Sequence, residues 1–448
     1  MTGICGLVGP ETDDLESKAE TILSLMRIRG PKSQTSSQNG PSGEKIVIGI
    51  CDSIGTHSSS RSAVPLALDG VLFRDDEGPH NTEPAGPSRL IRTPGAFAFL
   101  TSIQNHLIAG RDIVGQKPLY SGQIGTHAVA FASLRSPLIS IGIPEPKPVP
   151  PGRVIRASAQ GFETMSDYSL KQPKEEPTSE MAATQTLNEL FTEAVGRIVP
   201  RGSGMAFSGG LDSAIVARVA KNNGLEPELV SVGLKGQQEL EHAEKTAKSF
   251  GLSITIRELT SSEILNSLPM VVEMIETSDP VIVGISVPIY FACQKAREMG
   301  LNYLAVGQLS DELFGGYGKF EEIAVRGGTD VLAMEMFNSV IGASGKDFDP
   351  GDKLAVAAGL ELCSPFAYLP FVEYALKLPA SLRVNLIDGN VIRKYILRRL
   401  AARLNLPDSV VDRPKKAVQY SSGVQKVLLK EAKRQGMSLG KMLESFTK

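Results

Sequence analysis

Apolar and polar positions alternate in short blocks over the first third of the chain. Apolar runs at 45–50, 95–100 and 128–131 are separated by segments rich in Gly, Pro, Ser and Thr. Short runs bounded by turn residues predict β-strands joined by turns. One stretch, residues 13–27, has the pattern of a helix. We therefore expect a β-rich domain over residues 1–172.

The pattern changes after residues 171–179, whose Pro- and Glu-rich composition is typical of a linker. Apolar residues then recur at helical spacing between Leu187 and Ile198, and strand patterns alternate with helical ones from there on. The strand patterns lie at 229–234, 252–259 and 302–306. Alternation of this kind predicts an α/β domain, here 180–448, with an open parallel sheet that binds ligands at the carboxyl ends of its strands.

Composition and charge narrow the classes of function. The 448 residues carry 47 basic and 49 acidic side chains, a formal net charge of −2, which favours neither nucleic acid nor a membrane as a partner. Four cysteines are scattered without a CxxC pair, so no zinc site or disulfide framework is indicated. The amino terminus has no export signal pattern, and no apolar run approaches a membrane span. We expect a cytoplasmic protein that acts on small molecules.

The most informative segment is the glycine turn Ser208-Gly209-Gly210-Leu211-Asp212-Ser213. Its two glycines let the backbone approach phosphate oxygens, and a helix that starts near Asp212 offers free N–H groups. The chain has no GxxxxGK(S/T) loop, so the turn favours cleavage of ATP between the α- and β-phosphates. An acid beside phosphate needs a cation between them, which makes Asp212 a candidate Mg²⁺ ligand. The alternative is an ordinary strand-turn-helix corner capped by aspartate.

A second segment, residues 306–317, again follows a strand pattern. Its Asp311-Glu312 pair could complete the Mg²⁺ coordination begun by Asp212, because both segments leave carboxyl ends of strands. The following Gly315-Gly316 would allow a tight turn beneath a ligand. A capped surface helix is the alternative reading of this segment alone.

Taken in order, these segments resemble the asparagine synthetase family. The synthetase motifs are SGGLDS at 208–213, SDELFGGY at 310–317, GLELCSPF at 359–366 and RPKK at 413–416. The first domain resembles the family's type 2 glutamine amidotransferase domain, with GICG at 3–6, RGP at 29–31, GAFAF at 95–99, GRDIVGQKPLY at 110–120 and FAS at 131–133. The resemblance implies a four-layer αββα first domain of the Ntn-hydrolase type, followed by a doubly wound parallel-sheet PP-loop synthetase domain with added helices.

The resemblance also implies a nucleotide site. The turn from Ser208 to Ser213 would wrap the pyrophosphate of ATP, and Asp212 and Asp311 would hold Mg²⁺. Val232 and Gly233, on the strand after the turn, would border the adenine, and Gly307 would be a further nucleotide-binding position.

The reaction implied by the resemblance has two steps. A carboxylate displaces pyrophosphate from ATP to form an acyl-adenylate, and an amine then displaces AMP to leave an amide. Glu361 would accept a proton from the amine, and Lys415 would stabilise the charge on the departing groups. Lys394 also matches a family lysine, although a solvated helix face explains it equally well.

The first domain departs from the family where glutamine would be hydrolysed. Glutamine-hydrolysing members carry cysteine directly after the initiator methionine, where this chain has Thr2, and a threonine hydroxyl ionises far less readily than a thiol. Thr2 is thus a weak nucleophile candidate, and Cys5 reads as a buried apolar residue. The family's RGPD is RGPK at 29–32, and its NGEIYN is reduced to DGVLFR at 69–74. We expect this domain to be inactive, with residues such as Arg29 and Asp112 kept for the fold.

The second domain departs around the acceptor. Gln308 replaces an acid, Cys363 an arginine and Tyr368 an aspartate of the family motifs. Cysteine cannot reproduce the bidentate recognition of a carboxylate by arginine, so aspartate is not assured as the substrate.

The sequence therefore favours an ATP-dependent, AMP-forming amide ligase that uses aspartate or a related carboxylate and ammonia or another amine. One alternative is intramolecular amide formation of the β-lactam synthetase kind, and another is a non-catalytic scaffold that binds nucleotide. Nitrogen or sulfur transfer to tRNA would call for a basic face and catalytic cysteines, which the composition does not indicate. For the assembly of the chain, we consider a homodimer.

Overall fold

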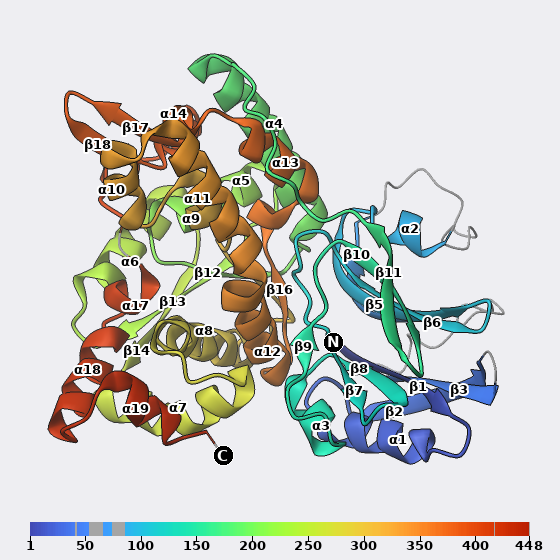
Figure 1. Cartoon of the computed structure of the whole chain (residues 1–448). Helices are drawn as coiled ribbons and strands as arrows, with labels where there is room; N and C mark the ends of the chain where they lie inside the picture. Colours follow the sequence, from blue (N-terminus) through green and yellow to red (C-terminus); the bar gives the residue numbers. More distant parts are fainter. Residues whose placement is uncertain (41–42, 53–65, 74–85, 416, 448) are drawn as a thin grey trace. The chain divides into compact units, whose positions relative to one another are not determined.

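The computed structural model of the chain describes residues 1–40, 43–52, 66–73, 86–415 and 417–447 (Figure 1). The chain forms two units, Met1–Lys171 and Gln172–Lys448. Two residues of the motifs above, Arg74 and Lys416, lie outside the described residues. Within the described residues, no helix combines the length and the apolar character required to cross a bilayer.

Two antiparallel sheets build the first unit, with strand orders β2-β3-β1-β8-β7-β9 and β11-β10-β6-β5-β4. The strands are β1 (Thr2–Pro10), β2 (Lys32–Asn39), β3 (Glu44–Asp52), β4 (Leu66–Leu72), β5 (Gly95–Ile103), β6 (His106–Arg111), β7 (Tyr120–Ile124), β8 (Ala128–Ala132), β9 (Lys147–Pro148), β10 (Arg153–Ser158) and β11 (Gly161–Asp167). One buried cluster joins Ile4 and Phe131 of the first sheet to Leu100 and Leu107 of the second. The sheets therefore pack face to face around an apolar core.

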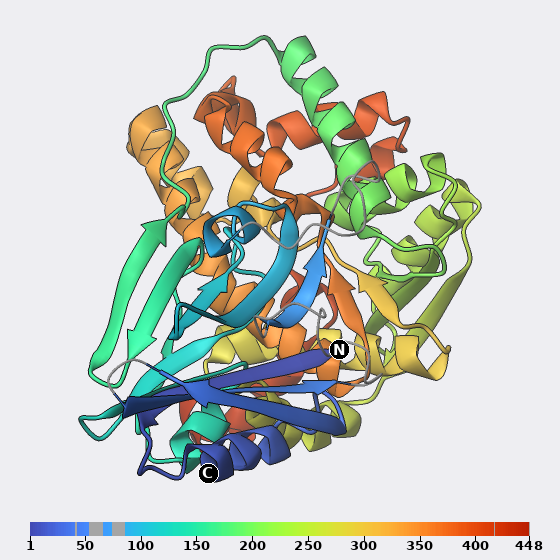
Figure 2. The same cartoon turned by 90° about the vertical axis from the view of Figure 1, so that its right-hand side faces the viewer.

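Helices cover the two outer faces of these sheets unequally. The predicted helix is α1 (Leu15–Leu25), and it packs with α3 (Arg135–Ser140) against the first sheet (Figure 2). On the second sheet, the described residues supply only the short α2 (Pro87–Leu90), whose Leu90 joins a cluster with Phe97 and Phe99. The expected αββα arrangement is thus present with its second helical layer reduced to one turn in the described part of the chain.

A five-stranded parallel sheet forms the centre of the second unit. Its strands are β12 (Gly204–Ala206), β13 (Glu228–Leu234), β14 (Ile254–Leu259), β15 (Tyr303–Ala305) and β16 (Glu361–Cys363), in the order β14-β13-β12-β15-β16. The chain therefore starts in the middle, runs to one edge and returns to the other, which confirms the doubly wound fold. The order reverses between β12 and β15, and ligands of such sheets bind at the carboxyl ends of the strands at this switch point.

Helices lie on both faces of this sheet. The helices that connect or flank the first strands are α4 (Glu180–Ile198), α5 (Leu211–Asn222), α6 (Gln238–Phe250), α7 (Ser261–Ile275) and α8 (Pro280–Glu298). Residues of α8 and α12 (Asp349–Ala357) pack with Val230 and Leu304 on one face. Helices α5 and α6 contact β12 and β13. A Cβ on Gly233 would approach Leu240 of α6, whereas the neighbouring Val232 packs with α8 and α12, so α6 lies on the other face (Figure 1).

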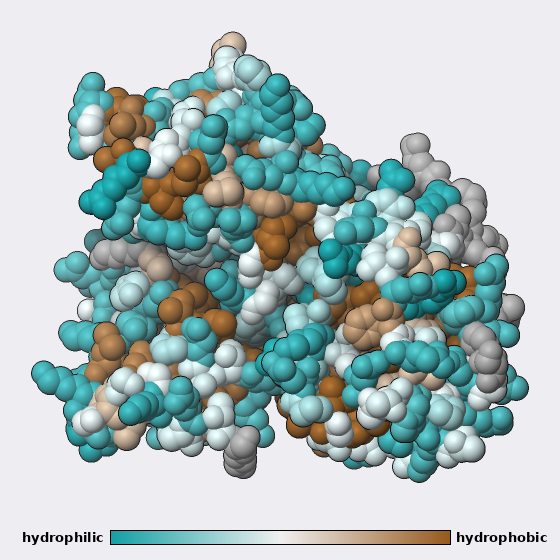
Figure 3. Space-filling model, viewed as in Figure 1, coloured by the Kyte–Doolittle hydropathy of each residue, from teal (hydrophilic) through white to brown (hydrophobic). Residues whose placement is uncertain are grey.

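The rest of the second unit is mostly helical, as predicted. It contains α9 (Ser310–Phe314), α10 (Lys319–Arg326), α11 (Gly328–Ala343), the π-helical η2 (Ser344–Phe348), the 3₁₀-helical η3 (Pro365–Ala367), α13 (Leu369–Lys377), α14 (Ala380–Arg383), the hairpin β17 (Val384–Ile387) and β18 (Asn390–Arg393), α15 (Tyr395–Arg403), α16 (Asp408–Val411), α17 (Val418–Ser421), α18 (Val424–Arg434) and α19 (Leu439–Glu444). Figure 3 shows apolar side chains gathered over the β17–β18 hairpin and α10, where Val325 and Leu386 are exposed.

The segment predicted as a linker is fixed to the second unit. The backbone N–H of Glu176 donates to the carbonyl of Lys377, and the Glu175 carboxylate accepts from the N–H of Ala380 at 2.8 Å. The same carboxylate lies 3.6 Å from the guanidinium of buried Arg383. The glutamates of this stretch therefore bind the end of α13 and the start of α14.

Candidate active site

The glycine turn connects β12 to α5 and is held by bonds within itself. Gly209 has φ +67°, and a Cβ there would lie 2.9 Å from both the His242 Cδ2 and the Ala243 Cα, so only glycine fits. The Ser208 Oγ accepts from the Gly210 N–H at 3.2 Å, and the Ser213 Oγ donates to the Gly210 carbonyl at 3.2 Å. The two hydroxyls, predicted as phosphate donors, thus first of all set the shape of the turn.

The second predicted segment follows β15 and meets the first. A Cβ on Gly307 would lie 3.1 Å from the Asp212 Cβ, so the two loops are in close contact at the switch point. Leu309, at φ +73°, precedes α9 in the left-handed region, a strained conformation that is commonest at functional sites. A Cβ on Gly316 would lie 1.8 Å from the Asp311 Oδ1, which leaves no room for any side chain there.

Four charges converge where the loops meet. The Lys394 Nζ lies 2.6 Å from Asp212 and 2.7 Å from Asp311, and the Lys415 Nζ lies 3.0 Å and 2.8 Å from the same two carboxylates. The Ser310 hydroxyl donates to the Asp212 Oδ1 at 2.8 Å. We call Asp212, Asp311, Lys394 and Lys415 the charge cluster. Its members come from four separate segments of the chain.

Lys394 is a buried member of the charge cluster, with 1% of its side chain exposed. The interpretation of this residue as part of a solvated helix face is therefore wrong. The error has a local cause: Lys394 is the N-cap of α15, with φ +55°, so its side chain does not follow the helix faces that the sequence pattern describes.

The charge cluster stabilises its own ionised state. Burial alone would raise the pKa of Asp212, but Lys394 and Lys415 outweigh it and hold that pKa below the usual range. Burial alone would lower the pKa of Lys415, but Asp212 and Asp311 outweigh it and raise the pKa above its usual value. Both groups are therefore charged at neutral pH, as a site for phosphate and a cation requires.

The carboxylates of the charge cluster fit a magnesium ion. Mg²⁺ is usually held by one or two carboxylates together with substrate phosphates and water. Asp212 and Asp311 both reach the same two cationic Nζ atoms, which shows that they face common cation positions. The described residues contain no group of three or more His, Cys, Asp or Glu side chains suited to a metal, so the remaining ligands would have to come from substrate and water.

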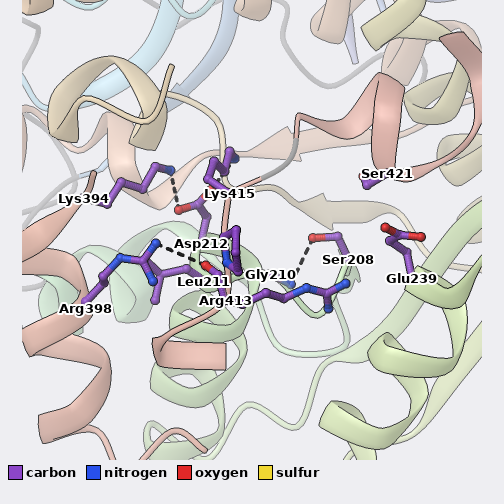
Figure 4. Close-up of a pocket in the computed structure, with 11 residues that line it drawn as sticks. Ser208, Gly210, Leu211, Asp212, Glu239, Lys394, Arg398, Arg413, Lys415 and Ser421 are labelled. Carbon is purple, nitrogen blue, oxygen red and sulfur yellow. Dashed lines mark hydrogen bonds and ion pairs between the residues drawn. The ribbon is translucent and has the colours of Figure 1, made fainter. Parts of the chain in front are cut away.

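A pocket opens beside the charge cluster (Figure 4). Its walls are Ser208, Gly210, Leu211, Asp212, Glu239, Lys394, Arg398, Arg413, Pro414, Lys415 and Ser421. The start of α5 forms one wall, so the N-terminal end of this helix faces the pocket. A wall of helix N–H groups and basic side chains suits an anion such as a polyphosphate.

Several predicted residues lie outside the wall of this pocket. Asp311 pairs with Lys394 and Lys415 of the pocket wall but is not itself part of the wall. Gly307 packs beneath Asp212. Val232 and Gly233 lie on β13, where a Cβ on Gly233 would approach Leu240 to 3.2 Å. Their assignment to the adenine therefore stays a prediction.

Glu361 also lies away from the pocket. It is the first residue of β16 and pairs with Tyr303, whereas Cys363, two residues on, reaches the carboxyl end beside Ala305. The pocket gathers at the carboxyl ends of the strands, so the geometry does not bring Glu361 to the charge cluster. Its role as a proton acceptor stays a prediction.

The three substituted positions around the acceptor have different surroundings. The Gln308 side chain donates to the Asp347 carbonyl at 2.9 Å and accepts from the Ser364 hydroxyl at 3.4 Å. The Tyr368 hydroxyl donates to Glu193 on α4 at 2.7 Å, so this position serves packing against a helix. The backbone carbonyl of Cys363 accepts from the Val306 N–H at 2.9 Å, so Gln308 and Cys363 both contact the loops beside the site.

A buried acid pair lies behind Asp311. The carboxyl groups of Glu312 and Asp347 are hydrogen-bonded to each other, and the Tyr317 hydroxyl donates to Glu312. Burial, followed by the charges of Glu312 and Asp311, raises the pKa of Asp347 well above its usual value. Asp347 belongs to the π-helical η2, a conformation frequent at functional sites. One proton shared by the pair accounts for the contact.

Thr2 and the charged residues Arg29, Asp69 and Asp112 of the first unit are buried. The Arg29 Nε donates to the Thr2 carbonyl at 2.7 Å and its Nη2 to Asp69 at 2.8 Å, and Ser133 donates to the same Asp69 oxygen at 3.0 Å. The Asp112 carboxylate accepts backbone N–H bonds from Phe97, Val114, Gly115 and Gln116. These contacts give Arg29 and Asp112 the structural roles that the sequence suggested for them.

Comparisons with known proteins agree with the motifs. The model of the family described as "Asparagine synthase" matches residues 186–341 and 343–440. A protein of Methanocaldococcus jannaschii named "Putative asparagine synthetase (glutamine-hydrolyzing) 1" is 33% identical over 263 residues, which are 52% of this chain and 48% of that protein. This chain thus matches about half the length of that relative.

Other similarities extend further along the chain. The asparagine synthetase (glutamine-hydrolyzing) of Sandersonia aurantiaca is 26% identical over 439 residues, covering 93% of this chain and 81% of that protein. Among solved structures, the NH3-dependent NAD synthetase of Campylobacter jejuni is 15% identical to this chain, with a TM-score of 0.28. The match covers 60% of this chain and 93% of that chain. The fold assignment rests on the strand order itself.

Proposed function

Because the chain belongs to the asparagine synthase family, we propose that its second unit is an ATP-dependent amide ligase. It adenylates a carboxylate, aspartate or a related acid, releases pyrophosphate, and transfers ammonia or another amine with release of AMP. The observation that carries the proposal is the meeting of Asp212 and Asp311, from two loops at the switch point, with Lys394 and Lys415.

The first step needs stabilisation of negative charge. A carboxylate oxygen bonds to the α-phosphorus of ATP while the bond from that phosphorus to the oxygen bridging to the β-phosphate breaks. The N-terminal end of α5 and the two lysines are suited to bind the phosphate oxygens on which this charge develops. Asp212 and Asp311 would hold Mg²⁺, which neutralises charge on those oxygens when bound.

The second step joins the amine nitrogen to the acyl carbon, breaks the bond to AMP and releases a proton from nitrogen. Lys415 would stabilise the departing phosphate, because its charge is maintained by the two carboxylates. Glu361 is kept as the proposed proton acceptor. Gln308, which contacts the loops beside the site, is the position we expect to influence the choice of acceptor.

We propose that the first unit does not hydrolyse glutamine. Arg29 is paired with Asp69 and with the backbone of Thr2, so this guanidinium is already engaged by the protein. Ammonia or a substrate amine would then be the nitrogen source. We place the reaction in the cytoplasm, since all four cysteines are buried free thiols.

Pyrophosphate release from ATP, assayed with a panel of carboxylates with and without ammonia or glutamine, tests the proposal. We expect release that depends on one carboxylate and is supported by ammonia. Release without any added amine would indicate ring closure within the substrate. No release with any carboxylate would contradict the ligase and favour a scaffold.

A further inference from the structure

Two arginines line the pocket, and their hydrogen bonding differs. The guanidinium of Arg398 donates to the backbone carbonyls of Arg393 at 2.9 Å, of Val411, and of Arg413 at 3.1 Å. Three of the five N–H groups of Arg398 therefore fix the chain segment that carries Lys415. Its neighbour Arg413 uses only its backbone in this clamp.

The side chain of Arg413 has an unsatisfied donor. Its Nη1 is buried from solvent and makes no hydrogen bond to any described residue. In Figure 4 the guanidinium extends toward Ser208 and Gly210 of the glycine turn, away from Arg398. Buried N–H groups in native proteins are almost always paired, so an orphan in a pocket wall calls for a ligand.

Arg413 differs from the two lysines of the pocket wall, because among the described residues no ion pair holds its guanidinium. Lys394 and Lys415 are each bound to the two carboxylates of the charge cluster, so the four charges balance. Glu239 is the other acidic residue in the pocket wall, and its side chain is not without a partner. The remaining polar side chains on this side are the hydroxyls of Ser208 and Ser421.

We infer that Arg413 binds the pyrophosphate part of ATP and the pyrophosphate product. The planar guanidinium fork matches two oxygens of a phosphate group, and such charge-assisted bonds are among the strongest hydrogen bonds in proteins. The clamp of Arg398 on the Arg413 carbonyl fixes the backbone from which the side chain reaches the turn. The assignment rests on the proposed function, and it separates a pyrophosphate region of the pocket from the region of the α-phosphate.

The test compares two ligands on the full chain by calorimetry with Mg²⁺ present. The probes are inorganic pyrophosphate and AMP, and the variants are Arg413→Gln, Arg413→Lys and the control Arg326→Gln, an exposed arginine of α10. We expect Arg413→Gln to weaken the binding of pyrophosphate about tenfold to a hundredfold and to leave the affinity for AMP unchanged. Arg413→Lys, which keeps the charge without the fork, should fall between, and Arg326→Gln should match the unaltered protein.

Each outcome bears on the inference. Unchanged pyrophosphate affinity in a folded Arg413→Gln protein, judged by circular dichroism and thermal unfolding, would overturn it. Equal weakening of AMP and pyrophosphate would also overturn it, because that would assign Arg413 to the pocket as a whole. If the unaltered protein bound neither probe, the proposed function itself would fail, and this assignment with it.

Discussion

Buried charges serve different purposes in the two units. In the first unit, Arg29 and Asp69 form a pair that also bonds to the Thr2 carbonyl and the Ser133 hydroxyl. In the second unit, the charge cluster joins four groups from four segments at the edge of a pocket. The first arrangement fixes a fold, whereas the second holds charges that a ligand can engage.

The difference explains how related motifs can persist in both units with unequal function. Asp112 accepts four backbone N–H bonds, and Arg111 donates to three backbone carbonyls. Such residues are required by the fold, so their presence is no sign of catalysis. Charges bound mainly to one another, beside a helix terminus and a pocket, are the stronger indication of chemistry.

The largest effect is expected from Asp212→Asn. The change removes one carboxylate from the charge cluster and from the proposed Mg²⁺ site, so carboxylate-dependent pyrophosphate release should fall about a thousandfold. Asp330→Asn, an exposed acid of α11, is the control and should keep full activity. Activity of Asp212→Asn within a few fold of the control would contradict the site.

Removing one partner of a buried pair tests the comparison through stability. Lys394→Met and Arg29→Met each leave a buried carboxylate without its main partner and should lower the free energy of unfolding by about 3–5 kcal/mol. Denaturant unfolding of the full chain, monitored separately for each unit, measures this loss.

The matched double variants distinguish the two roles. Arg29→Met with Asp69→Leu replaces a pair by apolar side chains and should recover most of the lost stability while pyrophosphate release continues. Lys394→Met with Asp212→Leu should recover stability in the same way but lose pyrophosphate release. If the first double variant lost activity as completely as the second, the contrast between the units would be wrong.

The acid pair behind Asp311 predicts a pH dependence. Since the pKa of Asp347 is raised by burial and by its acidic neighbours, the folded protein binds a proton that the unfolded chain releases above its ordinary pKa of 3.8. Stability therefore falls as the pH rises through the window between that value and the raised one. Asp347→Asn should increase the free energy of unfolding by about 1–2 kcal/mol at pH 8 and leave it unchanged near pH 3. Destabilisation at pH 8 would refute the shared proton.

The smallest effect is expected from Thr2→Ala. If the first unit does not hydrolyse glutamine, ammonia-dependent activity should change by less than about twofold, because Thr2 belongs to the first unit and takes no part in the proposed ligase reaction. Glutamate release from glutamine measures the other half of the prediction. Glutamate formation that rose with ATP and acceptor, and vanished in Thr2→Ala, would show that the first unit is active.

Local pattern was sufficient to predict much of the fold. The apolar runs gave β3, β5 and β8, and strand-helix alternation gave the parallel sheet. The glycine turn was recognisable because Gly209 needs a positive φ and close packing, which leave a signature in sequence. The short helix α2, which covers the second sheet in the described part of the first unit, left no such signature.

The partners across the site were beyond local pattern. Lys394 and Asp212 are 182 positions apart, and Lys394 takes a left-handed conformation that helical periodicity cannot express. The roles of Arg398 and Arg413 depend on which carbonyls and which pocket their side chains reach, although Arg413 lies within the RPKK motif. Glu361 shows the converse, because its motif is clear and its place in the fold is away from the pocket.

The central claim is that the second unit joins a substrate carboxylate to the α-phosphorus of ATP. The most direct test supplies the active carboxylate labelled with ¹⁸O and analyses the AMP by mass spectrometry. The account predicts one ¹⁸O atom transferred to each AMP, because the bond between carboxylate oxygen and phosphorus survives when the amine displaces AMP from the acyl carbon. AMP without label, or ADP as the nucleotide product, would contradict it.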